Sequence, residues 1–418
     1  MRNLKRRQNQ FRRAAIGVAA IAAWSSAASA GGFDIHEQST VFLGSASAGS
    51  AAGGSLGSMF WNPAATAQFP GLNSESSYTL ILPYANVDIT NSPLGPGSNG
   101  SSGNIGIDAA TSASYGAYQL GKDVWVGIAL NSPFGLASKP ENTSYSGSYL
   151  GVTSKLITMN ANPTIAYRIA PGITIGAGVQ IEWAQTKLQF RDSPVSIAQF
   201  GGNDWAFGGT AGITLEPRQG TTIGLGYRSQ MTHDLEGSFA GLLTGGNGVP
   251  GVVSITLPDI VTLSARQVVT PTTRLLGTIE WTNWSVFKNL PLSLPGGNQL
   301  SVPANWHDGW FFSVGGEYDY SPLLTLRSGV AYELSPIQDA SERLVQVPDN
   351  NRVWLSIGGS YKWSDSITLD AGYSHIFVED GGFSQSTPLL NGIPTGPTFT
   401  GNTHASIDLF SVGVRTKW

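Results

Sequence analysis

Apolar and polar residues alternate with a period of two along most of this chain. Near the carboxyl end, every second position is apolar and the positions between are small or charged; the apolar ones include Phe410, Val412, Val414 and Trp418. The stretch from Ile173 to Trp183 follows the same pattern. Successive side chains of a β-strand point to opposite faces, so each stretch predicts a strand with one apolar face. A sandwich has such strands too, but many long ones with aromatic residues near their ends favour a barrel in lipid.

About fourteen segments read as strands when turn residues are taken as their limits. Their approximate positions are 72–90, 107–120, 122–134, 153–169, 172–190, 203–216, 220–238, 253–269, 271–288, 306–320, 322–334, 351–363, 365–379 and 403–418. Short connections such as Ala170-Pro171 alternate with long loops such as 135–152 and 380–402, as in outer-membrane barrels. We therefore predict an all-β fold, a 14-stranded antiparallel transmembrane β-barrel over residues 72–418.

The first 30 residues predict export. Six arginine and lysine residues lie within the first 13, an apolar run follows from Ala14 to Trp24, and Ala28-Ser29-Ala30 offers the small residues that a signal peptidase accepts. We expect residues 1–30 to be removed. The rest of the chain has no unbroken apolar segment long enough for a membrane-spanning helix, so a helical membrane protein is not expected. Export together with a barrel places the chain in the outer membrane of a Gram-negative bacterium.

Residues 31–71 differ from the rest of the exported chain. Gly, Ala and Ser dominate from Gly44 to Ser58, charged residues are nearly absent after Glu37, and the two-residue alternation is missing. This segment is either a flexible tail or a compact plug inside the barrel. Small residues allow close approach of one backbone to another, and the walls can satisfy the plug's hydrogen bonds. We therefore predict an N-terminal lumenal hatch over residues 31–71, and fourteen strands enclose enough room for it.

Composition restricts the chemistry that this chain can perform. Charged residues make up 12% of it, about half the share of a typical soluble domain. Without the first 30 residues, 17 basic residues stand against 27 acidic ones, a formal net charge of −10, and no nucleic-acid partner is expected. The absence of cysteine excludes disulfides and thiol chemistry. His36 with Glu37, and His233 with Asp234, lack metal-ligand spacing, so we predict no metal site and no cofactor.

Six stretches of the chain resemble, in the same order, the outer-membrane long-chain fatty acid transporters of the FadL type, whose relatives pass aromatic hydrocarbons. The stretches are Ser55–Gly71 with Trp61-Asn62-Pro63-Ala64 inside it, Asn131–Leu136, Asn162–Arg168, Leu257–Asp259, Trp281–Ser285 and Val347–Ser356. The resemblance covers essentially the whole exported chain. It implies a monomeric barrel through which hydrophobic ligands diffuse without an energy-coupling protein. It also implies an outer groove, an inner pocket and a sideways exit into the outer-membrane lipid.

The resemblance assigns roles to residues of the hatch and of the third strand. Asn62, Pro63 and Ala64 match the hatch motif, and they form a rigid turn because proline fixes one backbone angle. Phe33 matches an aromatic residue that plugs an apolar pocket and swings when ligand binds, although an aromatic near a free terminus is often disordered. The third-strand kink is matched by Asn131, Pro133, Phe134 and Gly135. Proline removes a ladder hydrogen bond and glycine weakens pairing, so a break here is expected, either as a lateral exit or as an ordinary strand end.

A fatty acid carboxylate drawn into an apolar lumen requires a cationic or hydrogen-bonding partner. Arg191 lies about one residue from an arginine to which the family assigns this task. His307 falls where the family has a lysine, and a histidine is mostly neutral near pH 7 unless a carboxylate raises its pKa. We take both as carboxylate-binding candidates. Trp281 and Trp284 are expected to anchor at a membrane interface.

The sequence thus predicts a passive outer-membrane channel for hydrophobic compounds, with long-chain fatty acids as the expected cargo. One alternative keeps the barrel and changes the cargo to monoaromatic hydrocarbons. Another is a structural or adhesive barrel, which needs neither a plug nor a break in the third strand. A barrel enzyme such as a lipase would need an activated serine, and no nucleophile elbow occurs, so no catalytic residue is assigned.

Overall fold

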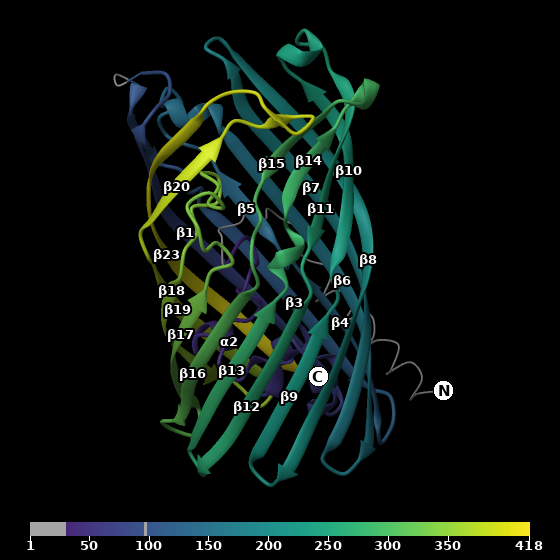
Figure 1. The fold of residues 1–418 in the computed structure, drawn as a ribbon. Coiled ribbons are helices and arrows are strands. Elements are labelled where there is room, and N and C mark those ends of the chain that lie inside the picture. Colours follow the sequence, from purple (N-terminus) through teal and green to yellow (C-terminus); the bar gives the residue numbers. More distant parts are fainter. Residues whose placement is uncertain (1–30, 96–97) are drawn as a thin grey trace.

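The computed structural model describes residues 31–95 and 98–418; the expected signal segment, residues 1–30, lies outside them. Figure 1 shows one barrel of tilted strands that encloses the amino-terminal segment near one end. All neighbouring wall strands run antiparallel. The last strand, β23 (Thr398–Lys417), pairs with the first, β1 (Leu72–Asn91), from Asn73 opposite Lys417 to Asn91 opposite Thr400, which closes the ring. The predicted fold class is confirmed, and closure leaves no unpaired edge for lipid.

In the described part of the chain, the 14 wall strands in ring order are β1, β3 (Ala109–Gln119), β4 (Val124–Asn131), β6 (Thr153–Ala170), β7 (Ile173–Ser193), β8 (Ser196–Arg218), β9 (Thr221–Arg228), β12 (Ile260–Thr270), β13 (Thr273–Thr282), β16 (Gly309–Asp319), β17 (Leu324–Leu334), β18 (Arg352–Lys362), β19 (Ile367–Val378) and β23. Shorter strands extend the wall or lie in the loops: β2 (Gly100–Asn104), β5 (Gly135–Ser138), β10 (Met231–Ala240), β11 (Val249–Leu257), β14 (Asn289–Ser293), β15 (Gln299–Pro303), β20 (Gly381–Ser386), β21 (Leu389–Leu390) and β22 (Ile393–Pro394).

The helical segments are short. In the hatch they are α2 (Thr40–Leu43), η1 (Ser50–Ala52), η2 (Leu56–Met59) and η3 (Pro63–Gln68); in the loops they are η5 (Ser146–Tyr149), η6 (Leu242–Thr244), η7 (Trp284–Val286) and η8 (Pro295–Gly297). Across residues 31–95 and 98–418, no helix is both long and apolar enough to cross a membrane.

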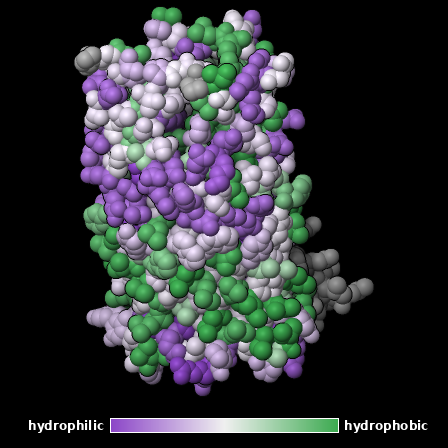
Figure 2. All heavy atoms as spheres, in the orientation of Figure 1, coloured by the Kyte–Doolittle hydropathy of each residue, from purple (hydrophilic) through white to green (hydrophobic). Residues whose placement is uncertain are grey.

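The alternation in the sequence becomes two faces of the wall. On β7, Ile175 and Val179 are 44% and 53% exposed, whereas Gln180 and Glu182, at positions of the other parity, are buried in the lumen. Figure 2 shows the outward apolar residues gathered over the lower half of the barrel, below a hydrophilic belt. An outer face of this kind suits contact with lipid, while the polar residues face the interior.

Three expected strands are shorter than the alternation predicts. The segment 220–238 is interrupted between β9 and β10, and 253–269 is interrupted between β11 and β12, at Pro258 and Asp259. Proline cannot donate to a ladder. The Asp259 carboxylate accepts hydrogen bonds from the Tyr227 hydroxyl (2.6 Å) and from the main-chain N–H of Gln230 (3.0 Å), so it joins the two breaks. The third segment, 271–288, ends as a strand at Thr282.

The hatch, residues 31–71, lies inside the barrel and is almost entirely buried. Inward hydroxyl groups of the wall bind its backbone. Hatch N–H groups of Thr40, Gly49 and Ala51 donate to Ser77 Oγ (3.0 Å), Thr278 Oγ1 (2.9 Å) and Ser264 Oγ (3.0 Å), respectively. A segment with little regular structure thereby has its polar backbone groups satisfied.

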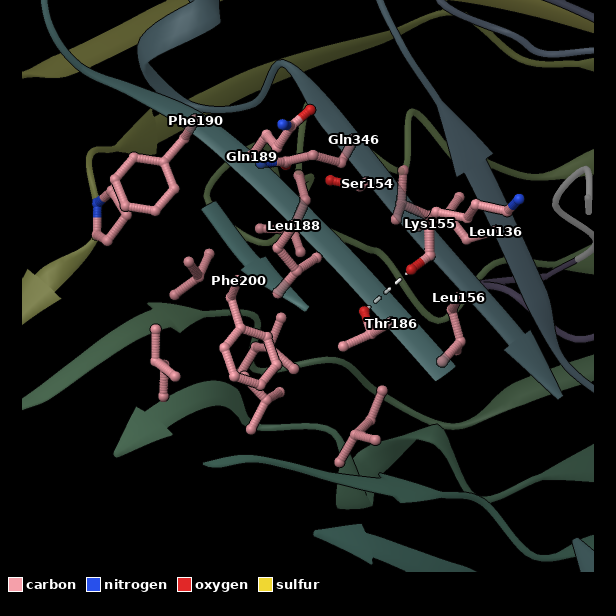
Figure 3. A pocket seen from close by; sticks show the side chains of 18 of the residues that line it. Leu136, Ser154, Lys155, Leu156, Thr186, Leu188, Gln189, Phe190, Phe200 and Gln346 are labelled. Carbon is pink, nitrogen blue, oxygen red and sulfur yellow. Dashed lines mark hydrogen bonds between the residues drawn. The ribbon is translucent and has the colours of Figure 1, made fainter. Parts of the chain in front are cut away.

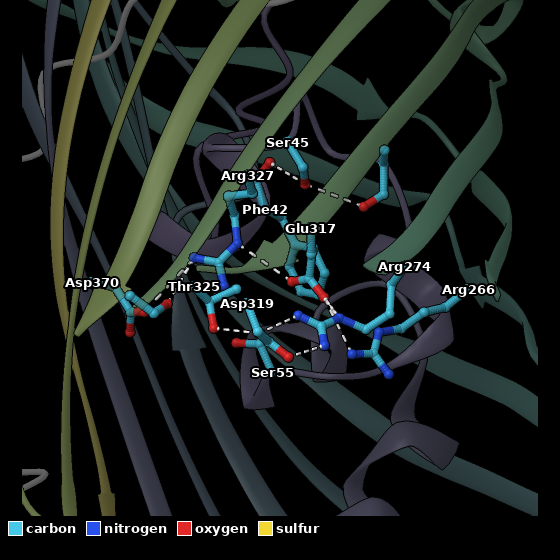
Figure 4. Close-up of polar contacts among 12 residues, drawn as sticks. Phe42, Ser45, Ser55, Arg266, Arg274, Glu317, Asp319, Thr325, Arg327 and Asp370 are labelled. Atoms are coloured by element: carbon cyan, nitrogen blue, oxygen red, sulfur yellow. Dashed lines mark hydrogen bonds and ion pairs between the residues drawn. The ribbon is translucent and has the colours of Figure 1, made fainter. Parts of the chain in front are cut away.

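A charged network lines the wall beside the hatch. Figure 4 shows Glu317 among arginine side chains, close to the hatch residues Phe42 and Ser45. The Glu317 carboxylate lies 2.9 Å from Arg274 Nε, 3.2 Å from Arg266 Nη2 and 3.4 Å from Arg327 Nε. Charges buried in a lumen require such partners, because an unpaired charge there is costly.

Candidate functional site

The Asn62-Pro63-Ala64 turn joins the hatch to the wall. Asn62 caps η3: its Oδ1 accepts a hydrogen bond from the Ala64 N–H (3.0 Å), and Pro63 occupies the first helical position. The side-chain nitrogen of Asn62, Nδ2, donates hydrogen bonds to oxygens within reach at Ala51 O (2.9 Å), Ile213 O (3.1 Å) and Thr214 Oγ1 (3.2 Å). One side chain thus links two turns of the hatch to β8.

Inward glycines of the wall make room for the hatch. A Cβ atom on Gly226 of β9 would lie 1.7 Å from the main-chain oxygen of Trp61, and one on Gly224 would lie 1.8 Å from that of Ala51. On β17, a Cβ on Gly329 would lie 2.0 Å from Ser45 O. These atoms are backbone and cannot turn away, so only glycine allows the hatch and the wall to approach so closely.

Phe33 lies within a cage of aromatic side chains at the upper side of the hatch. Its ring centroid is 4.5 Å from that of Trp284, 5.5 Å from Phe287, 5.7 Å from Trp306 and 6.5 Å from Phe134. Such edge-on contacts are favourable beyond the burial of apolar area. Trp284 is 1% exposed, so its expected role as a membrane anchor is wrong: η7 turns it inward, onto the hatch.

An apolar cavity begins at Phe33 and runs toward the long loops. Figure 3 shows side chains of β6, β7 and β8 converging on it. Its apolar lining includes Leu136, Leu156, Leu188, Phe190, Phe200, Leu235, Ile255, Leu292 and Leu300; its polar lining includes Ser154, Thr186, Ser301 and Gln346. A mostly apolar cavity with few polar groups is typical of a site for a small hydrophobic molecule.

Lys155 is the only basic residue among the described residues that line the cavity. Its main-chain oxygen accepts a hydrogen bond from Thr186 Oγ1 (3.0 Å). On β6 the neighbouring Ser154 and Leu156 are buried, and Figure 3 shows the Lys155 side chain pointing away from the cavity. Strand alternation explains this orientation. The cavity therefore offers neutral groups to a ligand.

The two carboxylate-binding candidates lie outside the cavity lining. Arg191 donates to three oxygens near the loop ends of the strands: Ser148 Oγ (3.2 Å), Pro194 O (2.8 Å) and Thr143 O (3.3 Å). His307 is half exposed, and its Nε2 lies 2.9 Å from Glu342 Oε1. The structure therefore does not bring Arg191, His307 and Phe33 into one site.

The third wall strand breaks where its sequence predicts. β4 ends at Asn131 and β5 begins at Gly135. Between them the backbone binds the hatch: the Ile35 N–H donates to Pro133 O, and the Gly135 N–H donates to Phe33 O, each at 2.8 Å. Phe134 turns inward to the aromatic cage, and both amide atoms of the buried Asn131 side chain lack a partner among the described residues.

The break interrupts the ladder between β3 and the third wall strand. β3 pairs with β4 from Ser114 to Gln119. Among the described residues, the next β-bridge on that side of the break joins Gly106 to Ser138. On the other side, β5 pairs with β6. A second cavity lies beside this interruption, with Gly106 and Ser138 in its lining, and Leu136 and Gln346 line both cavities. The two cavities are thus neighbours.

Below Phe33, five buried carboxylates gather around the start of the hatch. This acidic cluster consists of Asp34, Glu37, Glu280, Glu333 and Asp349. His36 Nε2 lies 2.8 Å from Glu280 Oε1 and 3.6 Å from Asp34 Oδ2, and the three side chains are close enough to hold a metal ion. Burial raises the pKa of the Glu37 carboxyl, in the hatch, to about 7. Sequence spacing could not show this cluster, because Glu280 lies on β13, far from the hatch in sequence.

A closed outer-membrane barrel that holds its own amino-terminal segment and an apolar cavity defines a channel for hydrophobic compounds. The chain belongs to the family described as "Outer membrane protein transport protein (OMPP1/FadL/TodX)", whose model matches residues 21–418. The family resemblance and the outer-membrane location predicted from sequence are confirmed. Family members are transporters or channels.

Two curated relatives match most of the chain. The "47 kDa outer membrane protein" of Pasteurella multocida (strain Pm70) is 29% identical over 96% of this chain and 97% of its own length. The "Long-chain fatty acid transport protein" of Escherichia coli (strain K12) is 27% identical over 88% of this chain and 92% of its own length.

Solved structures share the fold. A Pseudomonas aeruginosa FadL homologue superposes with a TM-score of 0.82 at 19% identity, over 92% of this chain and 99% of its own. The Pseudomonas putida toluene transporter TodX superposes with a TM-score of 0.67 at 16% identity, over 92% and 99%. At these identities the likeness speaks for the fold alone.

Proposed function

We propose that this chain takes up long-chain fatty acids by passive diffusion across the outer membrane. The observation that carries the proposal is the apolar cavity, which is lined mostly by aliphatic and aromatic side chains and ends at Phe33 of the hatch. The curated long-chain fatty acid transport protein, 27% identical, supports the same cargo. One chain contains the cavity, the hatch and the interrupted ladder of the wall, so we propose that it acts as a monomer.

The contacts of the hatch supply a route from binding to release. A ligand that reaches the floor of the cavity displaces Phe33 from its aromatic cage. The main chain of Phe33 and of Ile35 binds Gly135 and Pro133, so displacement of the hatch breaks the bonds that hold the third strand. The ligand then passes Leu136 into the second cavity and leaves through the wall at the interrupted ladder.

Sideways release is favourable for a long apolar chain. Each methylene that stays in hydrocarbon rather than entering water is worth about 0.8 kcal/mol. The acyl chain therefore gains most by moving directly into the lipid of the outer membrane. The carboxylate meets the polar groups of Ser154, Thr186 and Gln346 in the cavity, and Arg191 and His307 remain our candidates for its first contact outside it.

Monoaromatic hydrocarbons are the second candidate cargo. The cavity has no cationic side chain pointing into it among the described lining residues, and its floor is a cage of aromatic rings. Both features suit a neutral aromatic ligand, and the similar fold of the toluene transporter is compatible with it.

Binding and vesicle uptake of radiolabelled oleate by the purified, reconstituted protein tests the proposal, with toluene as competitor. A Pro133→Ala, Gly135→Ala variant, which favours a continuous strand, should lose uptake but keep binding. Pro322→Ala, in an exposed turn, is the matched control and should change neither. Toluene binding without oleate binding would show that the cargo is an aromatic hydrocarbon and not a fatty acid. Binding of neither would favour a structural barrel.

A further inference from the structure

The first residue after the expected cleavage site lies against a buried carboxylate. The Gly31 nitrogen is 2.5 Å from Glu333 Oε1, and the Gly32 nitrogen is 2.9 Å from Asp349 Oδ2. The second Glu333 oxygen accepts a hydrogen bond from Trp354 Nε1 at 3.0 Å. Glu333 is therefore held in place by the wall, with Oε1 directed at the start of the hatch.

The site leaves no room for a side chain at either glycine. A Cβ atom on Gly31 would lie 2.1 Å from Glu333 Oε1. One on Gly32 would lie 2.8 Å from the Trp306 ring and 2.9 Å from the Trp284 ring. The pocket is shaped for a bare backbone nitrogen.

The acidic cluster around this nitrogen contains more carboxyl groups than guanidinium groups. Its five carboxylates face the guanidinium groups of Arg228, Arg343 and Arg352, of which Arg352 binds Asp349 with Nε at 2.8 Å. Burial, together with Glu280, Glu333 and Glu37, raises the pKa of the Asp34 carboxyl well above its ordinary value. A further cation would lower the cost of burying these carboxylates together.

Cleavage after Ala30 would create that cation at the right atom. A peptide N–H at Gly31 is one neutral donor, whereas the α-amino group of a mature chain is an ammonium ion with three donors. We infer that the α-ammonium group of Gly31 binds the Glu333 carboxylate as a buried ion pair, which seats the start of the hatch. The inference rests on cleavage after Ala30. Phe33 is two residues away, so this pair also positions it under the cavity.

The experiment measures how fast the α-amine reacts in the purified, folded, full-length mature protein. Intact mass first establishes that the chain starts at Gly31. A short pulse of acetic anhydride is then applied at several pH values, and mass spectrometry of the amino-terminal peptide gives the rate. In the wild type, the α-amine should react at least about tenfold more slowly than in the denatured chain, and its pKa should exceed the ordinary 7.7 to 8.0.

Glu333→Gln is the diagnostic variant. It keeps the shape of the site and removes the charge, so the pKa of the α-amine should fall below the ordinary range through burial and the reaction should accelerate at pH 7. Glu317→Gln removes a buried carboxylate of the separate arginine network and should change neither value. Gel mobility of unheated samples identifies folded barrels.

Three results would overturn the inference. They are a mature chain that starts at another residue, a wild-type amine that reacts as fast as in the denatured chain, and a pKa that is the same in Glu333→Gln and wild type. None of these measurements uses a transported ligand. They can therefore disprove the Gly31–Glu333 ion pair without affecting the proposal of fatty acid uptake, and a failed uptake experiment would leave the ion pair untouched.

Discussion

The two halves of the lumen are built on the same strands, yet the lower half contains the hatch and the upper half contains the apolar cavity. Along β7, the inward residues of the lower half are polar, as at Gln180 and Glu182, whereas those of the upper half include Leu188 and Phe190. The outward face changes in the opposite sense, from Val179 to Lys187. The two-residue pattern therefore reverses its phase along one strand.

This reversal gives the two halves of the lumen different binding properties. The polar lower lumen binds the backbone of the hatch with hydroxyl groups and ion pairs, and the apolar upper lumen leaves a cavity. Phe33 lies at the boundary, where the hatch meets the cavity. The lower half should therefore control whether the lumen is closed, and the upper half should control which ligand binds.

The largest effect should come from Gly226→Ala in the lower lumen. Its Cβ would lie 1.7 Å from Trp61 O, so the hatch cannot seat without moving its backbone. We expect a folded barrel with strongly increased ion conductance in planar bilayers. Gly209→Ala, whose nearest neighbour would be 3.9 Å away, is the control and should conduct as the wild type does. Equal conductance of both variants would contradict close packing of the hatch.

Phe33→Ala tests the boundary. Loss of four aromatic contacts should weaken seating of the hatch by about 3 kcal/mol. Hydrogen exchange of the amides near Ile35 measures the loss. Phe42→Leu, deeper in the hatch, nearly conserves volume and should change exchange near Ile35 much less. Unchanged exchange in Phe33→Ala would show that the cage does not hold the hatch.

Asn62→Ala should weaken the hatch by about 2 kcal/mol, because it removes a helix cap and three donated hydrogen bonds. Protease sensitivity of residues 31–71 in the folded protein reports the change. Asn402→Ala, at an exposed position on β23, serves as the control. If the Asn62→Ala variant resists protease as well as the wild type does, Asn62 shapes the turn but does not stabilise the hatch.

Leu235→Ala acts on the upper half alone. It removes about two methylene contacts with an acyl chain, worth about 1.6 kcal/mol, so oleate affinity should fall roughly 15-fold. Ion conductance should stay at the wild-type value, because Leu235 lines the cavity and not the hatch. Increased conductance with unchanged oleate affinity would contradict our assignment of ligand binding to the upper half and closure to the lower half.

The smallest effect should be that of pH. The pKa of Glu37 is raised to about 7 by burial, with Glu333 raising it further and Arg352 lowering it, so the seated hatch favours the protonated form. That stability is fully present below the unfolded pKa of 4.5 and is lost as pH rises through 7. From pH 6 to 8 the loss is about 1.4 kcal/mol. Conductance should rise over this interval in the wild type and rise less in Glu37→Gln, where Asp34 remains as a buried carboxyl with a raised pKa.

Local pattern alone predicted much of the fold. The alternation located fourteen strands, and Pro133 with Gly135 located the break in the third one, because proline and glycine act on the backbone where they stand. The family resemblance implied an inner pocket, but the residues that line it were not predicted, since they come from many strands. The phase reversal within β7 is the signal that could have found them.

The strands, their two faces and the contrast between hatch and barrel can be read from the sequence alone, since they follow from neighbouring residues and from the period of a strand. Which side chains meet across the lumen is visible only in the folded barrel. Glu333 and Gly31 are 302 residues apart, and Trp284 lies on Phe33 rather than at the membrane. Such contacts depend on the register of every strand between them and on barrel closure, and no local pattern contains that information.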